Sequence, residues 1–328
     1  MNTLLVGAGY WGKNFIRLLE NKDNLFNLKY ILDSQNNLPN FKSFSNIEEL
    51  DNVIEDIDCA IICTPTKTHY EVSKYLLDKK IHLLVEKPLT SNLLEAEELF
   101  NIANQNDLVL MTDHTFLYNA SIKYIIEFIN SGELGELFHI SFERTNLGPI
   151  RTDVSCLWDL ATHDISIMNA LIDEEILSLN ASGFSSNSEI NHDMVNASIN
   201  FKSKFVSIFV SWLHPEKSRK IKIVGKDKMI IFDDLNTTEP LKIFNKKVKN
   251  VYEKNTDYSS IFNFSLGDVV SPYLDNKEPL KEALLDFESR ISNCKSLNNL
   301  NTQQLTLKTI KILEDLEKSI ISKGLKFL

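Results

Sequence analysis

The chain contains 328 residues, of which 43% are hydrophobic and 24% are charged, as in ordinary globular proteins of about two domains. Its formal net charge of −10 argues against non-specific binding to nucleic acid or to an anionic membrane, because both favour a basic surface. No apolar run approaches the roughly 18 residues needed to cross a bilayer, and the first residues carry no basic leader, so we expect a cytoplasmic protein.

The cysteines form neither a metal-binding nor a disulfide pattern. The four are scattered, with no Cys-x-x-Cys pair, and Cys59 and Cys63 bound an apolar run. Cysteine in such a run usually serves as a small core residue. We therefore expect reduced thiols, no structural zinc and no other metal.

The first third of the chain alternates short apolar runs with amphipathic segments. The runs have the length of strands and cover 3–6, 28–32, 59–63, 82–86 and 108–111. The segments between them show helical spacing and cover 11–20, 68–78 and 92–105, with Ser91 or Asn92 able to cap the last. Repeated strand–helix–strand units predict a parallel sheet with helices on both faces.

The pattern changes after about residue 115. A helix at 121–130 leads through a turn into a strand at 137–143, and a second helical pattern covers 157–171. Further strands are predicted at 197–201, 205–213, 219–224 and 229–232, with a hairpin turn at 202–204. Consecutive strands joined by short turns pair antiparallel. Two helices, at 280–292 and 303–321, follow.

A glycine-rich turn follows the first strand directly. It reads Gly-Ala-Gly-Tyr-Trp-Gly over 7–12, opens a helix, and is followed about 20 residues later by Asp33 at the end of the next strand. This is the dinucleotide fingerprint, in which the glycines allow a tight turn, approach of the pyrophosphate and close helix packing. Asp33 can accept hydrogen bonds from the adenosine ribose and would repel a 2′-phosphate, which favours NAD over NADP. The alternative is a purely structural glycine-rich turn.

Two further strand ends carry polar turns. Thr64-Pro65-Thr66-Lys67-Thr68-His69 follows the third predicted strand, where hydroxyl and N–H groups can line the nicotinamide-ribose end of a cleft or simply cap a helix. Glu86-Lys87-Pro88 follows the fourth. Ligands of open α/β sheets bind beyond the carboxyl ends of the strands, so Lys87 is well placed for chemistry. The alternative is a surface turn in which Lys87 points to water.

The helical pattern from Leu157 contains Asp159 and His163, four positions apart. On a helix the two share a face, so the aspartate can orient the imidazole and raise its basicity. Imidazole suits proton transfer near neutral pH. The alternative is a semi-buried structural histidine. A zinc site would need a second histidine or a cysteine at ligand spacing, and none lies nearby in the sequence.

These motifs, in this order and spacing, resemble the Gfo/Idh/MocA oxidoreductases. Supporting stretches are Asp113-His114-Thr115-Phe116 and Ser131-Gly132-Glu133-Leu134-Gly135. The sequence departs from many members at Ser155-Cys156-Leu157, where they carry paired glycines. The version with Arg151 and Asp153 ahead of the motif looks like a subgroup of bacterial surface-sugar enzymes.

The resemblance implies an α/β fold of two domains. These are an NAD-binding Rossmann domain with a doubly wound parallel sheet at 1–117, and a substrate-binding and oligomerisation domain at 118–328. The second domain would hold a large open, mostly antiparallel sheet, with the C-terminal helix able to pack back on the first domain. One face of that sheet would form a homodimer or homotetramer.

The resemblance also implies hydride transfer between nicotinamide and a secondary alcohol of a sugar or cyclitol. We expect His163 to be the acid/base, Asp159 to orient it or contact the substrate, and Lys87 to stabilise the alkoxide. Expected cofactor-binding residues are Gly7, Gly9, Tyr10, Trp11, Gly12, Asp33, Thr64, Pro65, Thr66, His69, Glu86 and Lys87. Expected substrate contacts are His114, Tyr118, Asn119, Arg144, Asn146, Arg151 and Asp153.

Three functions agree with this pattern. The first is an NAD-dependent sugar dehydrogenase acting on a nucleotide-linked or phosphorylated sugar, with Arg151 as the candidate contact for a phosphate or carboxylate. The second is a catabolic dehydrogenase of inositol or free sugars. The third is a dinucleotide-sensing regulator on the same fold, which need not keep Lys87, Asp159 and His163.

Overall fold

A computed structural model describes residues 1–20, 25–35, 38, 40–186, 192–249, 263–265, 267–275 and 277–322. The chain divides into two compact units. The first comprises Met1–Asn119, Ile165–Asn169 and Lys277–Glu314, and the second comprises Ala120–Asp164, Ala170–Asn276 and Asp315–Leu328. Within the described ranges, no helix has both the length and the apolar character that a bilayer crossing requires.

The first unit is built on a six-stranded parallel sheet of order β3-β2-β1-β4-β5-β6. The strands are β1 (Asn2–Val6), β2 (Asn27–Leu32), β3 (Lys42–Phe44), β4 (Cys59–Ile62), β5 (His82–Glu86) and β6 (Leu110–Asp113). The central strands are buried almost completely, as a parallel sheet covered on both faces requires. This confirms the predicted Rossmann-like sheet.

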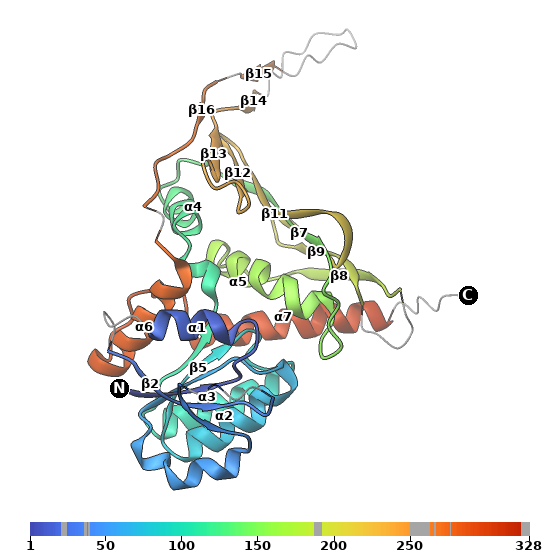
Figure 1. Ribbon diagram of the computed structural model, residues 1–328. Coiled ribbons are helices and arrows are strands. Elements are labelled where there is room, and N and C mark those ends of the chain that lie inside the picture. Colours follow the sequence, from blue (N-terminus) through green and yellow to red (C-terminus); the bar gives the residue numbers. More distant parts are fainter. Residues whose placement is uncertain are drawn as a thin grey trace, which may run out of the picture. The chain divides into compact units, whose positions relative to one another are not determined.

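Helices cover both faces of this sheet. Figure 1 shows α1 (Gly12–Leu19) on one side of the strands and α2 (His69–Asp78) and α3 (Leu93–Gln105) on the other. Short 3₁₀ turns connect the elements: η1 (Ile47–Asn52), η2 (Ile54–Asp56), η3 (Thr66–Thr68) and η4 (Thr115–Tyr118). Asn92 caps α3 as predicted, because its side-chain oxygen accepts from the N–H groups of Leu94 at 2.9 Å and Glu95 at 3.2 Å.

Two details of this sheet differ from the prediction. β6 begins at Leu110 rather than at Leu108, because Asp107 has a left-handed φ of 53° and the Leu108 N–H bonds back to Ala103 O at 2.9 Å. Those residues end α3 instead of starting the strand. β3 was not predicted, since it is a three-residue edge strand with one apolar side chain.

Two C-terminal helices contribute to the first unit. α6 (Pro279–Asn293) belongs to it entirely, whereas α7 (Gln303–Ser322) begins there and ends in the second unit. Phe287 of α6 stacks on Phe26 with ring centroids 5.9 Å apart. The chain therefore returns to its N-terminal fold after completing the second sheet.

The second unit is built on an eight-stranded sheet of order β16-β13-β12-β11-β7-β10-β9-β8. Its strands are β7 (Leu137–Leu147), β8 (Ser178–Phe184), β9 (Met194–Asn200), β10 (Phe205–Ser211), β11 (Leu213–Gly225), β12 (Met229–Asp233), β13 (Leu241–Phe244) and β16 (Val269–Val270). A separate two-stranded ribbon pairs β14 (Lys247–Lys249) with β15 (Asn263–Ser265). The helical elements are α4 (Ala120–Asn130), the π-helix η5 (Leu157–Ala161) and α5 (Thr162–Leu171), the last shared between units.

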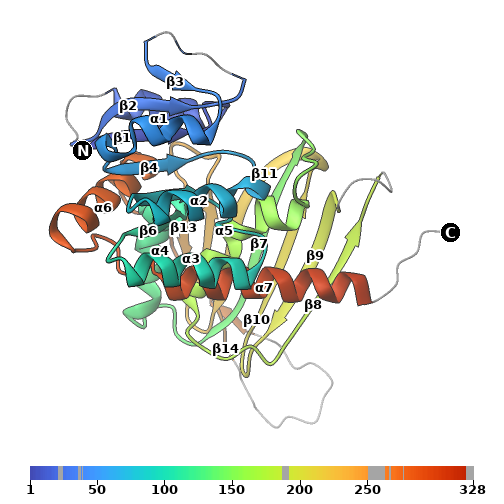
Figure 2. The ribbon, with the colours of Figure 1, turned by 90° about the horizontal axis from the view of Figure 1, so that it is seen from below.

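The sheet is mostly antiparallel, as predicted, with one exception. β9 and β10 form the expected hairpin, closed by the Phe201 N–H donating to Lys204 O at 2.9 Å. β10 and β11 follow one another in sequence, yet β7 lies between them, parallel to β10 and antiparallel to β11. Figure 2 shows β7, β10, β9 and β8 side by side.

The two faces of this sheet differ in burial. In β10, Val206, Ile208 and Val210 are buried, whereas Phe205, on the opposite face, is 47% exposed. This alternation is typical of an antiparallel sheet with one face against a core and one face not covered within the unit.

Candidate active site

The glycine turn after β1 has a different steric demand at each glycine. Gly7 has a φ of +90°, and a Cβ there would lie 2.9 Å from the Thr64 backbone N. A Cβ on Gly12 would lie 2.1 Å from Gly7 O, whereas a Cβ on Gly9 would meet nothing within 4 Å. Gly7 and Gly12 are therefore required by the fold, and the open space at Gly9 is where a pyrophosphate can approach the backbone.

The carboxylate of Asp33 is fixed beside this turn. Its oxygens accept from the Ala8 N–H at 2.6 Å and the Gln35 N–H at 2.8 Å. The turn itself is tied to β2 by the Gly7 N–H, which donates to Leu32 O at 2.9 Å. The acid therefore lies at the end of β2 beside the predicted pyrophosphate position.

The two aromatic residues of the turn are not core residues. Tyr10 is 88% exposed and Trp11 is 38% exposed. Both rings are available to a ligand on the first unit.

The turn after β4 is tied to the turn after β5 by a histidine. His69 is 1% exposed, and its ring nitrogens lie 2.9 Å from Pro88 O and 2.8 Å from Thr64 O. Thr68 also donates its hydroxyl to Thr64 Oγ1 at 2.8 Å. His69 thus positions the backbone on either side of a ligand site instead of facing one, while Thr64 and Pro65 remain accessible and Thr66 is buried.

Lys87 follows β5 immediately and lies among titratable groups from the neighbouring strand ends. Burial and the charge of Asp113 raise the pKa of Glu86 well above its usual range, while Lys87 acts to lower it. Burial raises the pKa of Cys63, at the end of β4. Burial and then the charge of Lys87 lower the pKa of His114 to about 3, so this imidazole is neutral at physiological pH.

The Asp159–His163 segment of the second unit is not a continuous α-helix. Asp159 lies in the π-helix η5, and His163 lies in the first turn of α5. The hydroxyl of Thr162 donates to Trp158 O, so a side chain competes with the backbone where the two helix types meet. Single π-turns inside helices are frequent at functional sites.

Arginines compensate the carboxylates around this segment. Asp159 accepts from Arg151 Nη1 at 3.0 Å and from Trp212 Nε1 at 3.3 Å. Arg151 also pairs with Asp153, with Nη2 to Oδ2 at 2.6 Å and Nε to Oδ1 at 2.9 Å. One arginine and two aspartates thus form a cluster with a net charge of −1.

Several predicted substrate contacts are already engaged inside their own unit. Tyr118 is 3% exposed and donates its hydroxyl to Asp286 Oδ2 at 2.6 Å, and His114 contacts Thr306 Oγ1 at 3.2 Å. Arg144 is 6% exposed and pairs with Asp164 at 2.8 Å. These contacts argue against direct substrate binding by the three residues.

Two asparagines complete the predicted set. Asn119, between η4 and α4, is partly exposed, and its N–H donates to Phe116 O at 3.1 Å. Asn146, at the end of β7, donates its side-chain amide to Gly148 O. Both stay candidate contacts.

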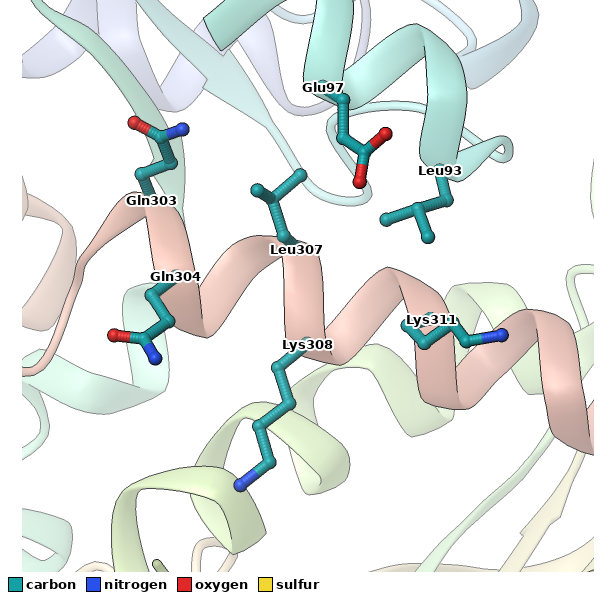
Figure 3. Close-up of a pocket in the computed structure, with 7 residues that line it drawn as sticks. All are labelled: Leu93, Glu97, Gln303, Gln304, Leu307, Lys308 and Lys311. Carbon is teal, nitrogen blue, oxygen red and sulfur yellow. The ribbon is translucent and has the colours of Figure 1, made fainter.

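A cavity of about 600 Å³ on the first unit lies away from these motifs, between α3 and α7. Figure 3 shows Leu93 and Glu97 on α3 directed toward α7, and Leu307 directed back toward them. Its lining also includes Gln303, Gln304, Lys308 and Lys311. No predicted catalytic or cofactor residue is among these, so we interpret the cavity as a gap in the packing of the two helices.

Comparison with known proteins identifies the family. Residues 1–114 match an oxidoreductase family model described by its NAD-binding Rossmann fold, and residues 122–231 match the Gfo/Idh/MocA C-terminal domain model. The chain belongs to the Gfo/Idh/MocA oxidoreductases.

Two curated relatives and one solved structure show the extent of the likeness. A UDP-N-acetylglucosamine 3-dehydrogenase of Acidithiobacillus ferrooxidans is 27% identical over 191 residues, 58% of this chain and 59% of that protein. A structure of that enzyme superposes with a TM-score of 0.80 at 20% identity, covering 98% of each chain. A myo-inositol 2-dehydrogenase of Thermotoga maritima is 25% identical over 43% of this chain and 44% of its own length.

GenD2 from gentamicin A biosynthesis, solved in complex with NAD, has a TM-score of 0.80 at 17% identity over 98% of this chain and 95% of its own. The sequence matches to the first curated relatives span less than two thirds of those proteins, 59% and 56% of their lengths.

Sequence reasoning assigned no role to Asp113, Trp212 or Asp164, each of which contacts or neighbours a predicted site residue. Asp113 carried a usable signal, because it ends β6 as Glu86 ends β5. Trp212 carried none, since its contact with Asp159 depends on the position of a distant strand. Among the described residues, no group of three or more His, Cys, Asp or Glu side chains could hold a metal ion.

Proposed function

We propose that this protein is an NAD-dependent dehydrogenase that exchanges a hydride with a secondary alcohol of a sugar. The observation that carries the proposal is the position of Lys87, directly after β5 in a sheet whose glycine turn leaves open space at Gly9. Cofactors of such sheets bind beyond the carboxyl ends of the strands. A lysine there lies where the reacting carbon would meet the nicotinamide.

The chemistry requires a base and a positive field. Hydride leaves a carbinol carbon when its hydroxyl proton is removed, and NAD, when bound, supplies the carbon that accepts the hydride. We assign proton transfer to His163 and stabilisation of the developing alkoxide to Lys87. Asp159, held by Arg151 and Trp212, supplies a fixed carboxylate at the same segment as His163.

The substrate we propose is a nucleotide-linked or phosphorylated sugar. The support comes from the UDP-N-acetylglucosamine 3-dehydrogenase relative, whose name also indicates carbon 3 as the first position to test. Arg151 does not add support, because Asp153 and Asp159 already compensate its charge. The net negative cluster is better suited to accepting hydrogen bonds from sugar hydroxyls than to binding a phosphate.

The cofactor we propose is NAD rather than NADP. Asp33 is fixed at the end of β2, where a carboxylate accepts hydrogen bonds from ribose hydroxyls and repels a 2′-phosphate. Replacing Asp33 with serine would remove that repulsion. We expect the ratio of NADP to NAD turnover to rise in the variant.

An NADH-absorbance screen tests the function. The wild-type protein is mixed with NAD and with free, phosphorylated and nucleotide-linked sugars, and with myo-inositol. We expect NADH to form fastest with a UDP-linked amino sugar. Faster turnover of myo-inositol or free sugars would favour the catabolic alternative, and NAD binding without any turnover would favour a regulator.

We also propose a homo-oligomer formed through the uncovered face of the eight-stranded sheet. That face presents Phe184 and Phe205, which are 42% and 47% exposed. Exposed aromatic residues on a sheet face favour a second copy of the chain as the cover. Light scattering should report a dimer or tetramer, and Phe205→Lys should shift it toward the monomer.

A further inference from the structure

Two carboxyl side chains face each other beside Lys87. Glu86 and Asp113 end the neighbouring strands β5 and β6 and are register partners in the parallel ladder. Register partners on adjacent parallel strands, about 4.8 Å apart, direct their side chains to the same face. The two groups lie within hydrogen-bonding reach, and they are 8% and 0% exposed.

Of the four carboxyl oxygens of Glu86 and Asp113, two accept a hydrogen bond from a nearby donor. Glu86 Oε2 accepts from the Lys87 N–H at 3.1 Å, and Asp113 Oδ1 accepts from the Thr115 hydroxyl at 3.0 Å. Within the part of the chain that the structure describes, no donor reaches Glu86 Oε1 or Asp113 Oδ2. Two ionised carboxylates would leave both oxygens buried without a hydrogen bond, which is costly.

One proton on the pair removes this cost. A protonated carboxyl donates to an ionised one, so a single proton supplies the missing donor. We propose that Glu86 and Asp113 share one proton, and that the resulting single negative charge balances the positive charge of Lys87 and fixes its backbone. The proposal adds Asp113 as a positioning residue for the site described above and, in its catalytic consequence, rests on the proposed function.

The other titratable groups at these strand ends agree with a singly charged pair. Burial raises the pKa of Asp113, and burial with the charge of Asp113 raises that of Glu86 further. Cys63, beyond β4, is a neutral thiol because burial and the two carboxyl groups raise its pKa. His114, beyond β6, is neutral because burial and Lys87 lower its pKa. The charges of Lys87, the carboxyl pair, Cys63 and His114 then sum to zero.

Infrared spectroscopy of the protein without cofactor or substrate tests the shared proton directly. At pH 7 we expect a carbonyl band of a protonated carboxyl that shifts when the aspartate and glutamate carboxyl carbons are labelled with ¹³C. The labelled wild-type protein suffices for this step. Absence of any such band would overturn the proposal without touching the dehydrogenase function.

Amide variants assign the band. It should disappear in Asp113→Asn and in Glu86→Gln, since an amide supplies the donor and no proton is needed. It should persist in Asp51→Asn, a matched control that removes an exposed carboxylate paired with Lys79. Persistence of the band in folded Asp113→Asn and Glu86→Gln would place the proton elsewhere and overturn the assignment.

The pH profile tests the positioning role. In the wild type, turnover should change where the pair loses its proton and gains a second negative charge beside Lys87. In Asp113→Asn that limb of the profile should be absent, because an ionised Glu86 beside an amide leaves the pair with one negative charge and no second carboxyl to ionise. If the wild type and Asp113→Asn showed the same change of turnover with pH, the positioning role of the pair toward Lys87 would be contradicted, although the infrared evidence for a shared proton would stand.

Discussion

The two units stabilise buried carboxyl groups in different ways. In the first unit, Glu86 and Asp113 face each other at the ends of β5 and β6, and burial raises the pKa of both. In the second unit, Asp164 and Asp159 accept from Arg144 and Arg151. Partner charge, as well as burial, therefore decides whether a carboxyl in this protein is ionised. It also predicts that the first region keeps a carboxyl proton at a pH above the usual carboxyl range.

The largest expected effect is the loss of stability when the buried ion pair between Arg144 and Asp164 is removed. Arg144 is 6% exposed and Asp164 is 2% exposed, so Arg144→Ala leaves a buried carboxylate without its cation. We expect the free energy of unfolding to fall by about 3–5 kcal/mol in urea titrations. Arg219→Ala, which removes a half-exposed ion pair with Asp234, should cost no more than about 1 kcal/mol. Equal losses in both variants would contradict the comparison.

The second prediction tests whether both regions serve one reaction. Lys87→Ala and His163→Ala should each lower turnover about 10²-fold or more, because one removes the positive field and the other the base. Calorimetric titration should show that NAD still binds. Lys79→Ala, which changes an exposed lysine paired with Asp51, should turn over normally. Near-normal rates in both variants would remove the catalytic assignment.

The third prediction separates folding from cofactor binding in the first unit. Gly9→Ala should fold with unchanged thermal stability, because its Cβ enters open space, yet bind NAD at least about tenfold more weakly. Gly12→Ala should fail to fold, because its Cβ would lie 2.1 Å from Gly7 O. Circular dichroism and calorimetry distinguish the two. Unchanged NAD affinity in Gly9→Ala would exclude this turn as the pyrophosphate site.

The last prediction concerns the pH dependence of stability in the first region. With raised pKa values, the folded protein keeps a proton that the unfolded chain has released, so the wild-type free energy of unfolding falls as pH rises above about 4. The slope is at most about 1.4 kcal/mol per pH unit for each proton held. In Asp113→Asn the amide replaces the shared proton as the donor, so the stability of the variant relative to wild type should increase from pH 5 to pH 8. Parallel curves from urea titrations would contradict the shared proton.

Most of the fold could be predicted from the sequence because its signals are local. The apolar runs of β1, β2, β4 and β5, and the cap at Asn92, needed only neighbouring residues to be recognised. The parallel pairing of β10 with β7 could not be predicted, because the two strands are distant in sequence and their turns carry no information about the pairing. The π-helix at Leu157–Ala161 was read as an α-helix, since both have similar spacing of apolar residues.

The positions of the site residues at the strand ends could be predicted from the sequence, but the side chains that they contact could not. The glycine turn, Asp33 and Lys87 follow strands directly, so their place at the sheet edge follows from the pattern. The compensation of Arg151 by Asp159, and the facing of Glu86 by Asp113, depend on tertiary register. Tyr118 was expected to contact substrate because it lies at the junction of the two predicted domains, yet it bonds to Asp286 of α6.

Hydride transfer itself is the central claim, and isotope tracing measures it directly. The wild-type protein is incubated with NAD and UDP-N-acetylglucosamine carrying deuterium at carbon 3, and the NADH formed is analysed by mass spectrometry. We predict one deuterium per NADH in the wild type and about 10²-fold less NADH, or lower still, from Lys87→Ala or His163→Ala in the same time. If the wild type binds NAD but forms no deuterated NADH with this sugar or with similarly labelled sugars and inositol, the account is contradicted.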